Sequence, residues 1–333
     1  MLQSPSLVQI INKSIAYKNL GDALLPVNNN AEFMSSSNAV TVTVCGQNDD
    51  EPVAFGSIVR CSERQAYVML GEVAEEYADK SVWVEKVENG EKLHHVFKIT
   101  KSVPLIDYSG ETHFEQTFGN RDEKPVHLHV LDSLIDNTVG LESLDVMKNV
   151  TVDFENNSNL DSWRDTVGFV VSDKFCYEKI TVNRFELLSL ADSESNVAVE
   201  NVEKLETILD YDGEVSMFQR DEFLTTLYST SGISCKVARI EGNVVGYIAN
   251  TSSNILQCYG ETEEVQRALF AAAAETMNPQ VTLYVRKNAN ATIEKLSENA
   301  LTHSNITRLN TRVVVNTIKW PKIGALNMGL HMF

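Results

Sequence analysis

The stretch from Cys235 to Lys287 restricts the fold more than any other part of the sequence, because the spacing of its apolar residues changes in a fixed order. Two short runs rich in β-branched residues flank Glu241-Gly242-Asn243 and predict a β-hairpin. A third strand follows, then a helical period from Thr262 to the Asn278-Pro279 pair, then a strand again. The predicted strands are 236–240, 244–249, 255–259 and 281–285. Since a helix connects the last two, we expect them to run parallel.

The first half of the chain repeats this strand pattern. Ala39–Cys45 alternates Val and Thr, Val53–Arg60 follows a turn, and Ala66–Val73 is a third strand-like run. A chain of 333 residues has room for two domains of ordinary size. We therefore predict an N-terminal domain over residues 1–183 and a C-terminal domain over residues 184–333, each with its own sheet. Little between them is typical of a flexible linker, so we expect one inseparable body.

The composition argues against several kinds of partner. The formal net charge of −18 disfavours nucleic acid and anionic membranes, since both attract clustered Lys and Arg. The five cysteines are widely spaced and form no CxxC pair, so we predict neither a disulfide framework nor a zinc site. No apolar run approaches the length of a membrane span. The sequence therefore predicts a soluble cytoplasmic protein without a bound metal.

The segment upstream of the central stretch carries a family resemblance. Ile208–Tyr228 reads ILDYDGEVSMFQRDEFLTTLY and is followed by KVARIEGNVVGY. With the strand and helix order, these residues resemble the second half of tandem-domain proteins of the GNAT superfamily, the acyl-CoA N-acyltransferases. Asp210, Asp212 and Arg220 match the pattern of that family. The resemblance implies an α/β fold with two GNAT-like domains, each a mixed, mostly antiparallel sheet flanked by helices.

The resemblance also implies a reaction, the transfer of an acyl group from acetyl-CoA or another acyl-CoA to an amine. The sequence does not specify whether the acceptor is a small molecule or a protein. Backbone groups near Leu70–Val73 would contact the thioester carbonyl, and Glu72 is the candidate base for the amine proton. The tyrosine that acts as general acid in many members falls by its spacing at Trp163, which has no usable proton. Tyr177 is the other candidate acid.

In the GNAT pattern, a basic, glycine-rich loop at a helix start holds the CoA pyrophosphate through its N–H groups. Ala74–Trp83 occupies this place here, and Lys80 and Ser81 join Leu70 and Val73 as candidate cofactor contacts. The Arg and Gly residues of the pattern are missing. Carboxylates stand at both expected helix starts instead, at positions 75, 76 and 79 and again at 261, 263 and 264. We therefore expect ordinary helix N-termini and weak or absent acetyl-CoA binding.

Three functions remain compatible with these patterns. The first is an acyl-CoA-dependent N-acyltransferase. The second is a non-catalytic pseudoenzyme that keeps the GNAT fold as a binding or interaction module, which the degenerate loops and the missing tyrosine favour. The third, an unrelated α/β binding protein, is disfavoured by the match over Ile208–Tyr247. Resemblance of fold does not by itself establish chemistry.

Other segments give weaker patterns. We predict helices at 6–17 and 141–148, and Val126–Leu131 as the parallel strand that follows the first-half loop. His127 and His129 share one face of that strand, but no further residue completes a ligand set. Near the C-terminus we predict a strand at Arg308–Asn316 and a strand-like tail over Lys319–Phe333 that completes the sheet.

Overall fold

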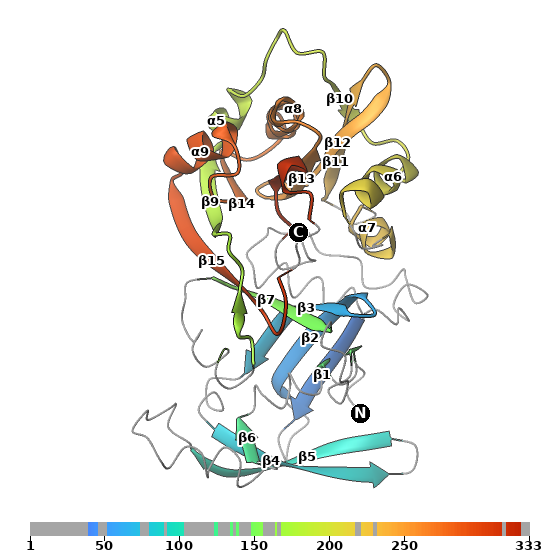
Figure 1. Ribbon diagram of the computed structural model, residues 1–333, viewed down its shortest axis with the longest axis vertical. Helices are drawn as coiled ribbons and strands as arrows, with labels where there is room; N and C mark the ends of the chain where they lie inside the picture. Colours follow the sequence, from blue (N-terminus) through green and yellow to red (C-terminus); the bar gives the residue numbers. More distant parts are fainter. Residues whose placement is uncertain are drawn as a thin grey trace.

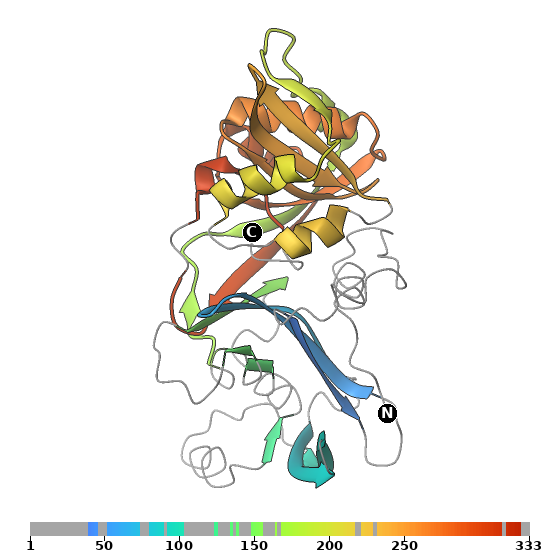
Figure 2. The ribbon, with the colours of Figure 1, turned by 90° about the vertical axis from the view of Figure 1, so that its right-hand side faces the viewer.

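The structure is a computed structural model. It describes residues 39–45, 52–73, 80–89, 92–102, 123–125, 134–135, 138–139, 148–155, 164, 168–216, 221–228, 232–314 and 318–327. Figure 1 shows an elongated arrangement, with the first-half strands in the lower part and most second-half helices in the upper part. Long strands join the two parts, which Figure 2 shows from the side.

An eight-stranded sheet combines strands of both halves in the order β1-β2-β3-β7-β15-β9-β14, with β8 paired to β15. Its strands are β1 (Ala39–Cys45), β2 (Pro52–Ser62), β3 (Gln65–Val73), β7 (Asn149–Glu155), β8 (Val171–Ser172), β9 (Tyr177–Asn183), β14 (Gln280–Arg286) and β15 (Thr302–Asn310). Second-half β15 lies between first-half β7 and β9, and β14 lies beyond β9. The prediction of two separate sheets is therefore wrong. Through this exchange β7 pairs with β15, and β14 pairs with β9.

A five-stranded sheet forms the rest of the second half, in the order β10-β11-β12-β13-β16. Its strands are β10 (Ala198–Asn201), β11 (Ser234–Ile240), β12 (Asn243–Asn250), β13 (Ile255–Gly260) and β16 (Ile323–Ala325). The helices are α5 (Arg184–Leu188), α6 (Glu206–Val215), α7 (Asp221–Tyr228), α8 (Glu263–Ala274) and α9 (Ala291–Glu298). The antiparallel series β11-β12-β13 repeats β1-β2-β3, as the sequence predicts.

A small third sheet lies where the sequence predicts a helix start. Lys80 and Ser81 begin β4 (Lys80–Asn89), which pairs antiparallel with β5 (Lys92–Ser102) and β6 (Glu123–Pro125). The prediction of a helix N-terminus around these two residues is therefore wrong. The run from Val82 to Val84 is β-branched and aromatic, and an Asn-Gly pair follows β4, so the local sequence favours a hairpin.

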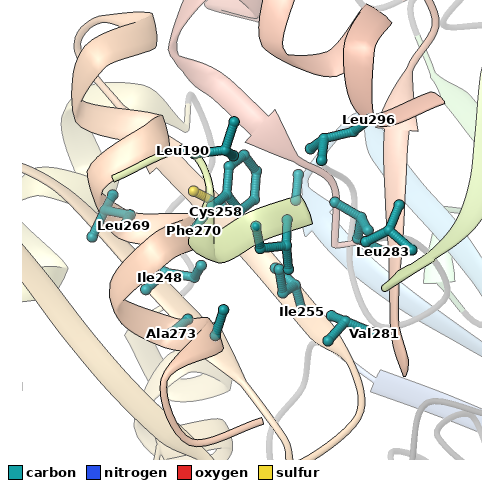
Figure 3. Packing of buried hydrophobic residues seen from close by; sticks show 14 of the residues in the cluster. Leu190, Ile248, Ile255, Cys258, Leu269, Phe270, Ala273, Val281, Leu283 and Leu296 are labelled. Atoms are coloured by element: carbon teal, nitrogen blue, oxygen red, sulfur yellow. The ribbon is translucent and has the colours of Figure 1, made fainter. Parts of the chain in front are cut away.

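Two buried clusters cover opposite faces of the β11–β13 strands, because successive side chains on a strand point to opposite sides. The first packs α6 and α7 on Tyr247 and Tyr259 and continues to Tyr67 and Tyr177 of the first half. The second packs α8 on Ile248 and Cys258. Figure 3 shows this second cluster, with Phe270 and Leu269 of α8 beside residues of β12 and β13. Since the first cluster contains residues of both halves, it joins them into one body.

Several further predictions meet a different outcome. The parallel neighbour of β3 is β7, whereas Val126–Leu131 lies outside the described residues. The segments 6–17 and 141–147 and Trp163 also lie outside them. The strand predicted at 308–316 instead runs from Thr302 to Asn310. Its first residues pair with β9, but they are mostly polar, so the sequence pattern did not show that the strand begins there. Of the C-terminal tail, only β16 is a strand in the described part.

Candidate functional site

The parallel strands β3 and β7 run side by side at first and then part. Gln65–Val68 pairs with Asn149–Val152. Beyond these pairs, β3 continues along β2 and β7 continues along β15. We call this place the first divergence. Among the described residues, no strand pairs with the β7-facing edge of Leu70–Val73. Such an edge can hydrogen-bond an extended ligand through its backbone groups.

The structure brings only some of the predicted site residues together. Leu70, Glu72 and Val73 lie on β3 at the first divergence. Lys80 and Ser81 instead pair with Ser102 and Lys101 of β5. The candidate acid Tyr177 lies on β9, on the far side of β15. The expected cofactor contacts therefore belong to two different sheets.

A buried polar network lies at the point where β3 and β7 part. The hydroxyl of Tyr67 donates to Oδ2 of Asp153 over 2.6 Å. Arg308 donates to both oxygens of the same carboxylate, from Nε at 2.8 Å and from Nη2 at 2.9 Å. All three residues are buried, so the ion pair is shielded from solvent. This network ties β3, β7 and β15 together at the start of the first divergence.

The charge of Arg308 is maintained by this arrangement. Burial alone would lower the pKa of its guanidinium, but the adjacent Asp153 carboxylate and its hydrogen bonds raise the pKa well above the ordinary value. This pair was not predicted from the sequence. A usable signal is present, however, because Asp153 follows four uncharged residues of its strand, NVTVDFE, and Arg308 is the one Lys or Arg in its strand, THSNITRLN. A charge within a central strand generally needs a partner.

Tyr177 is fully buried and already engaged. Its hydroxyl donates to Oδ2 of Asp173 over 2.6 Å, and the Arg308 guanidinium lies 5.0 Å from the centre of its ring. Burial raises the pKa of the Tyr177 hydroxyl well above its ordinary value, and the Asp173 carboxylate raises it further. A proton held in this way is directed at Asp173. To act as a general acid, Tyr177 would first have to leave that partner.

A row of uncharged polar side chains holds the paired part of β3 and β7. Asn149 donates to Gln65 over 2.9 Å, Gln65 donates to Thr151 over 3.0 Å, and Thr151 donates to Asn310 over 2.6 Å. All four are buried. Because buried polar groups are costly to leave unpaired, this row favours one register of β3, β7 and β15.

The second half contains a matching place. β13 and β14 follow the same strand–helix–strand order, and an isolated parallel bridge joins Asn254 to Thr282. The prediction that these strands are parallel is thus confirmed at their start. Beyond the bridge β13 keeps β12 and β14 keeps β9 as partners, so the strands part. We call this place the second divergence.

The second divergence is filled by the chain itself. β16 pairs antiparallel with β13, with Ala325 opposite Cys258 and Ile323 opposite Tyr259. On the other side, the backbone N–H of Leu326 donates to the carbonyl of Tyr284 on β14 over 2.8 Å. Residues 323–327 are all buried. At the second divergence, backbone groups of β13 therefore pair with β16. The corresponding edge of β3 at the first divergence has no strand partner among the described residues.

The start of α8, beside the second divergence, has partners within the protein for its three carboxylates. Glu261 pairs with Lys322, Glu263 accepts from the backbone and hydroxyl of Thr292 at 2.7 and 2.6 Å, and Glu264 accepts from Ser195 at 2.6 Å. The Thr262 hydroxyl caps the helix by accepting from the N–H of Val265. The prediction of an ordinary helix N-terminus is confirmed at this place.

The described residues contain neither a metal-binding cluster nor a membrane-spanning helix. No group of three or more His, Cys, Asp or Glu side chains is arranged there to hold a metal ion. Within the same part of the chain, no helix has both the length and the apolar character needed to cross a membrane.

The fold is similar to that of solved structures described as acetyltransferases. A presumed acetyltransferase from Pyrococcus horikoshii superposes with a TM-score of 0.52 at 12% identity, covering 97% of this chain and 95% of that chain. A tandem GNAT protein from the clavulanic acid biosynthesis pathway gives 0.46 at 8% identity, covering 93% and 96%. A GCN5-related N-acetyltransferase from Kribbella flavida gives 0.41 at 15% identity, covering 91% and 68%. The chain has a mixed α/β fold with two GNAT-like domains, the acyltransferase-like fold that the sequence predicts.

Sequence comparison is less specific than structure. Residues 23–171 match the model of a family described as a domain of unknown function, DUF7596. No curated protein matches the chain. The matched region contains β1–β3, β7 and the first divergence, and the description of that family assigns no activity.

Proposed function

We propose that the chain is a GNAT-like N-acyltransferase that takes acetyl-CoA or another acyl-CoA only in its N-terminal domain, residues 1–183. One observation carries the proposal. The edge of β3 over Leu70–Val73 has no strand partner among the described residues, while the equivalent place in the second half is filled by β16. An acyl-CoA bound along that edge would supply the activated acyl group. The C-terminal domain would then be non-catalytic.

The roles of individual residues follow from their places. The backbone of Leu70–Val73 would hydrogen-bond the extended pantetheine arm and polarise the carbonyl at its end. Glu72 lies on the same strand and is the proposed base for the amine proton. The Asp153–Arg308 pair would hold β3 and β7 at a fixed spacing, because both strands contribute to its hydrogen bonds.

The described residues offer fewer contacts to the phosphates of the cofactor than to its pantetheine arm. Lys80 and Ser81 belong to β4, so they do not form a loop at a helix N-terminus, and the Cβ of Ser81 stands where the family pattern has glycine. The described residues therefore fit the arm of an acyl-CoA better than its pyrophosphate. We expect weak acetyl-CoA binding in which the phosphates contribute little.

The second candidate is a non-catalytic module that retains the GNAT fold as a binding surface. The observation that favours it is the β4–β5 hairpin, which follows β3 at the position where the family pattern has a phosphate-binding helix start. The engaged hydroxyl of Tyr177 agrees with this alternative.

Isothermal titration with acetyl-CoA and with acetyl-pantetheine, which lacks the adenosine phosphates, separates the two candidates. The acyltransferase proposal expects one site per chain, dissociation constants above the micromolar range, and similar values for the two ligands. On adding either ligand, hydrogen exchange should become slower at residues 70–73 and should not change at residues 255–260. Release of free thiol in the presence of an amine panel then tests turnover. No binding of either ligand would favour the non-catalytic module, and two sites per chain would contradict the assignment to the N-terminal domain.

A further inference from the structure

The chain's last described residues, 318–327, lie between β13 and β14, and each of these strands has another sheet partner. β13 keeps β12 along its other edge, and β14 keeps β9 along seven paired positions. The backbone of residues 318–327, which we call the C-terminal segment, meets these strands through two pairs with β13 and one hydrogen bond to β14. Both walls of the second divergence therefore retain a sheet partner when the segment is taken away.

Gln266 of α8 holds the segment from one side. Its Nε2 donates to the carbonyl of Pro321 over 3.0 Å and to the carbonyl of Gly260 over 3.2 Å, so it joins the segment to β13. Its Oε1 accepts from Asn290 over 3.0 Å, which fixes the orientation of the amide. Gln266 is 1% exposed. A buried amide with all these bonds satisfied recognises the segment backbone at one position.

Gly324 fits a place with little room for a side chain. A Cβ built there would lie 3.2 Å from Cγ and Oε1 of Gln266 and 3.2 Å from Cζ of Phe270. Ala325 and Leu326 beside it are fully buried. The second divergence thus selects a very small residue at this position, followed by two apolar ones.

Polar and aromatic contacts fix both ends of the segment. Lys322 pairs with Glu261, and the indole of Trp320 packs on Phe175 at 5.2 Å and on Tyr177 at 5.8 Å between ring centres. At the other end, Asn327 donates to Oε1 of Gln257 over 2.6 Å. Each contact uses a particular side chain of the segment, so the recognition extends beyond backbone pairing.

We propose that the second divergence is a binding site for a peptide with the pattern Trp-Pro-Lys-Ile-Gly-Ala-Leu-Asn, and that the chain fills it with its own residues 320–327, of which Trp320–Lys322 form a 3-10 helical turn and Ile323–Ala325 form the strand β16. The ligand class is a peptide that adds a strand to β13, carries a lysine for Glu261 and has glycine at the position of Gly324. This proposal does not depend on acyl-CoA binding at the first divergence.

The test separates the segment from the folded protein. Residues 315–317 are replaced by a specific protease site, the full chain is folded and then cut, and the released fragment is exchanged for a fluorescein-labelled peptide of residues 318–327. Fluorescence polarisation measures binding. A chain ending at Val314, folded with and without the same peptide, serves as a second variant.

We expect saturable binding by the cut protein and a higher thermal unfolding midpoint when peptide is added. A Gly324→Val peptide should bind about 5-fold to 140-fold more weakly, because overpacking costs about 1–3 kcal/mol and 1.4 kcal/mol is a factor of ten. A Pro321→Ala peptide is the matched control, since Pro321 is exposed and its carbonyl remains; its affinity should change by about twofold. Absence of binding to the cut chain, or equal binding of the Gly324→Val peptide, would overturn the proposal.

Discussion

The two divergences have the same origin in sequence but differ in what lies between their strands. In each half, three antiparallel strands are followed by a strand parallel to the third. Between β13 and β14 the chain inserts β16, whereas the described residues place no strand between β3 and β7 beyond Val68 and Val152. A repeated strand pattern therefore produces two sites of different availability. The difference depends on a segment that is distant from the first-half strands in sequence but not in space. Trp320 of that segment packs on Tyr177 of β9, which lies 143 positions earlier.

The points where the strands part also differ. At the first divergence, Asp153 and Arg308 form a buried ion pair that Tyr67 joins. At the second, the bridging residues Asn254 and Thr282 are uncharged, and Thr251 accepts from the N–H of Asn254 over 3.0 Å. A buried ion pair holds its strands only while both members are present. The first divergence should therefore be the more sensitive of the two to a single substitution.

The largest effect should come from Asp153→Ala. This change leaves the Arg308 guanidinium buried without its carboxylate, which we expect to cost about 3–5 kcal/mol of unfolding free energy. Urea denaturation measures the loss. Glu200→Ala is the control, because it breaks the exposed Arg239–Glu200 pair and should cost about 0–1 kcal/mol. Equal, small losses in both variants would show that the ion pair does not hold the first divergence.

A smaller effect should follow from Gly324→Val in the intact chain. The new side chain would meet Gln266 and Phe270, and overpacking of this kind costs about 1–3 kcal/mol. The control is Gly213→Ala in α6, where a Cβ meets nothing within 4 Å and should stabilise the helix by about 0.5–1 kcal/mol. Thermal unfolding compares the two. If Gly324→Val is neutral, the second divergence is looser than the contacts of Gln266 indicate.

Ser81→Gly should have a still smaller effect. In a helix-start loop, this change would bring the backbone closer to a phosphate and strengthen acetyl-CoA binding. Because Ser81 of β4 pairs with Lys101 of β5, we expect a loss of about 0.5–1 kcal/mol of unfolding free energy and no gain in affinity for acetyl-CoA. Differential scanning fluorimetry and titration with acetyl-CoA give the two readouts. A gain in affinity would restore Lys80 and Ser81 as part of the first site.

The smallest effect should come from a single cut between Asp192 and Asn196, an exposed stretch between α5 and β10. Strands β9, β14 and β15 pair across the halves, and none of these pairs includes the cut residues. The two fragments should therefore co-elute in size exclusion and separate only in denaturant. Fragments that separate in native buffer would mean that the shared sheet does not hold the divergences in one body.

Much of the local structure could be predicted, because each element carries its own period. Ala39–Cys45 forms a strand with the predicted bounds, and Thr262 caps a helix that ends before Asn278. The candidate site was harder to predict. Leu70, Glu72 and Val73 do lie at a divergence, but Lys80 and Ser81 were assigned by family spacing, and an inserted hairpin changes that spacing. The buried pair of Asp153 and Arg308 lies 155 positions apart in sequence, beyond any local pattern.

The sequence by itself determined the kinds of element, their order and the repetition of three strands in each half, since alternation and helical spacing depend only on neighbouring residues. The tertiary structure decided which strands share a sheet. An edge strand offers hydrogen bonds that any strand of suitable length can take, so its partner depends on which segment reaches it in the folded chain. For that reason β15 lies between β7 and β9, and β16 fills the second divergence.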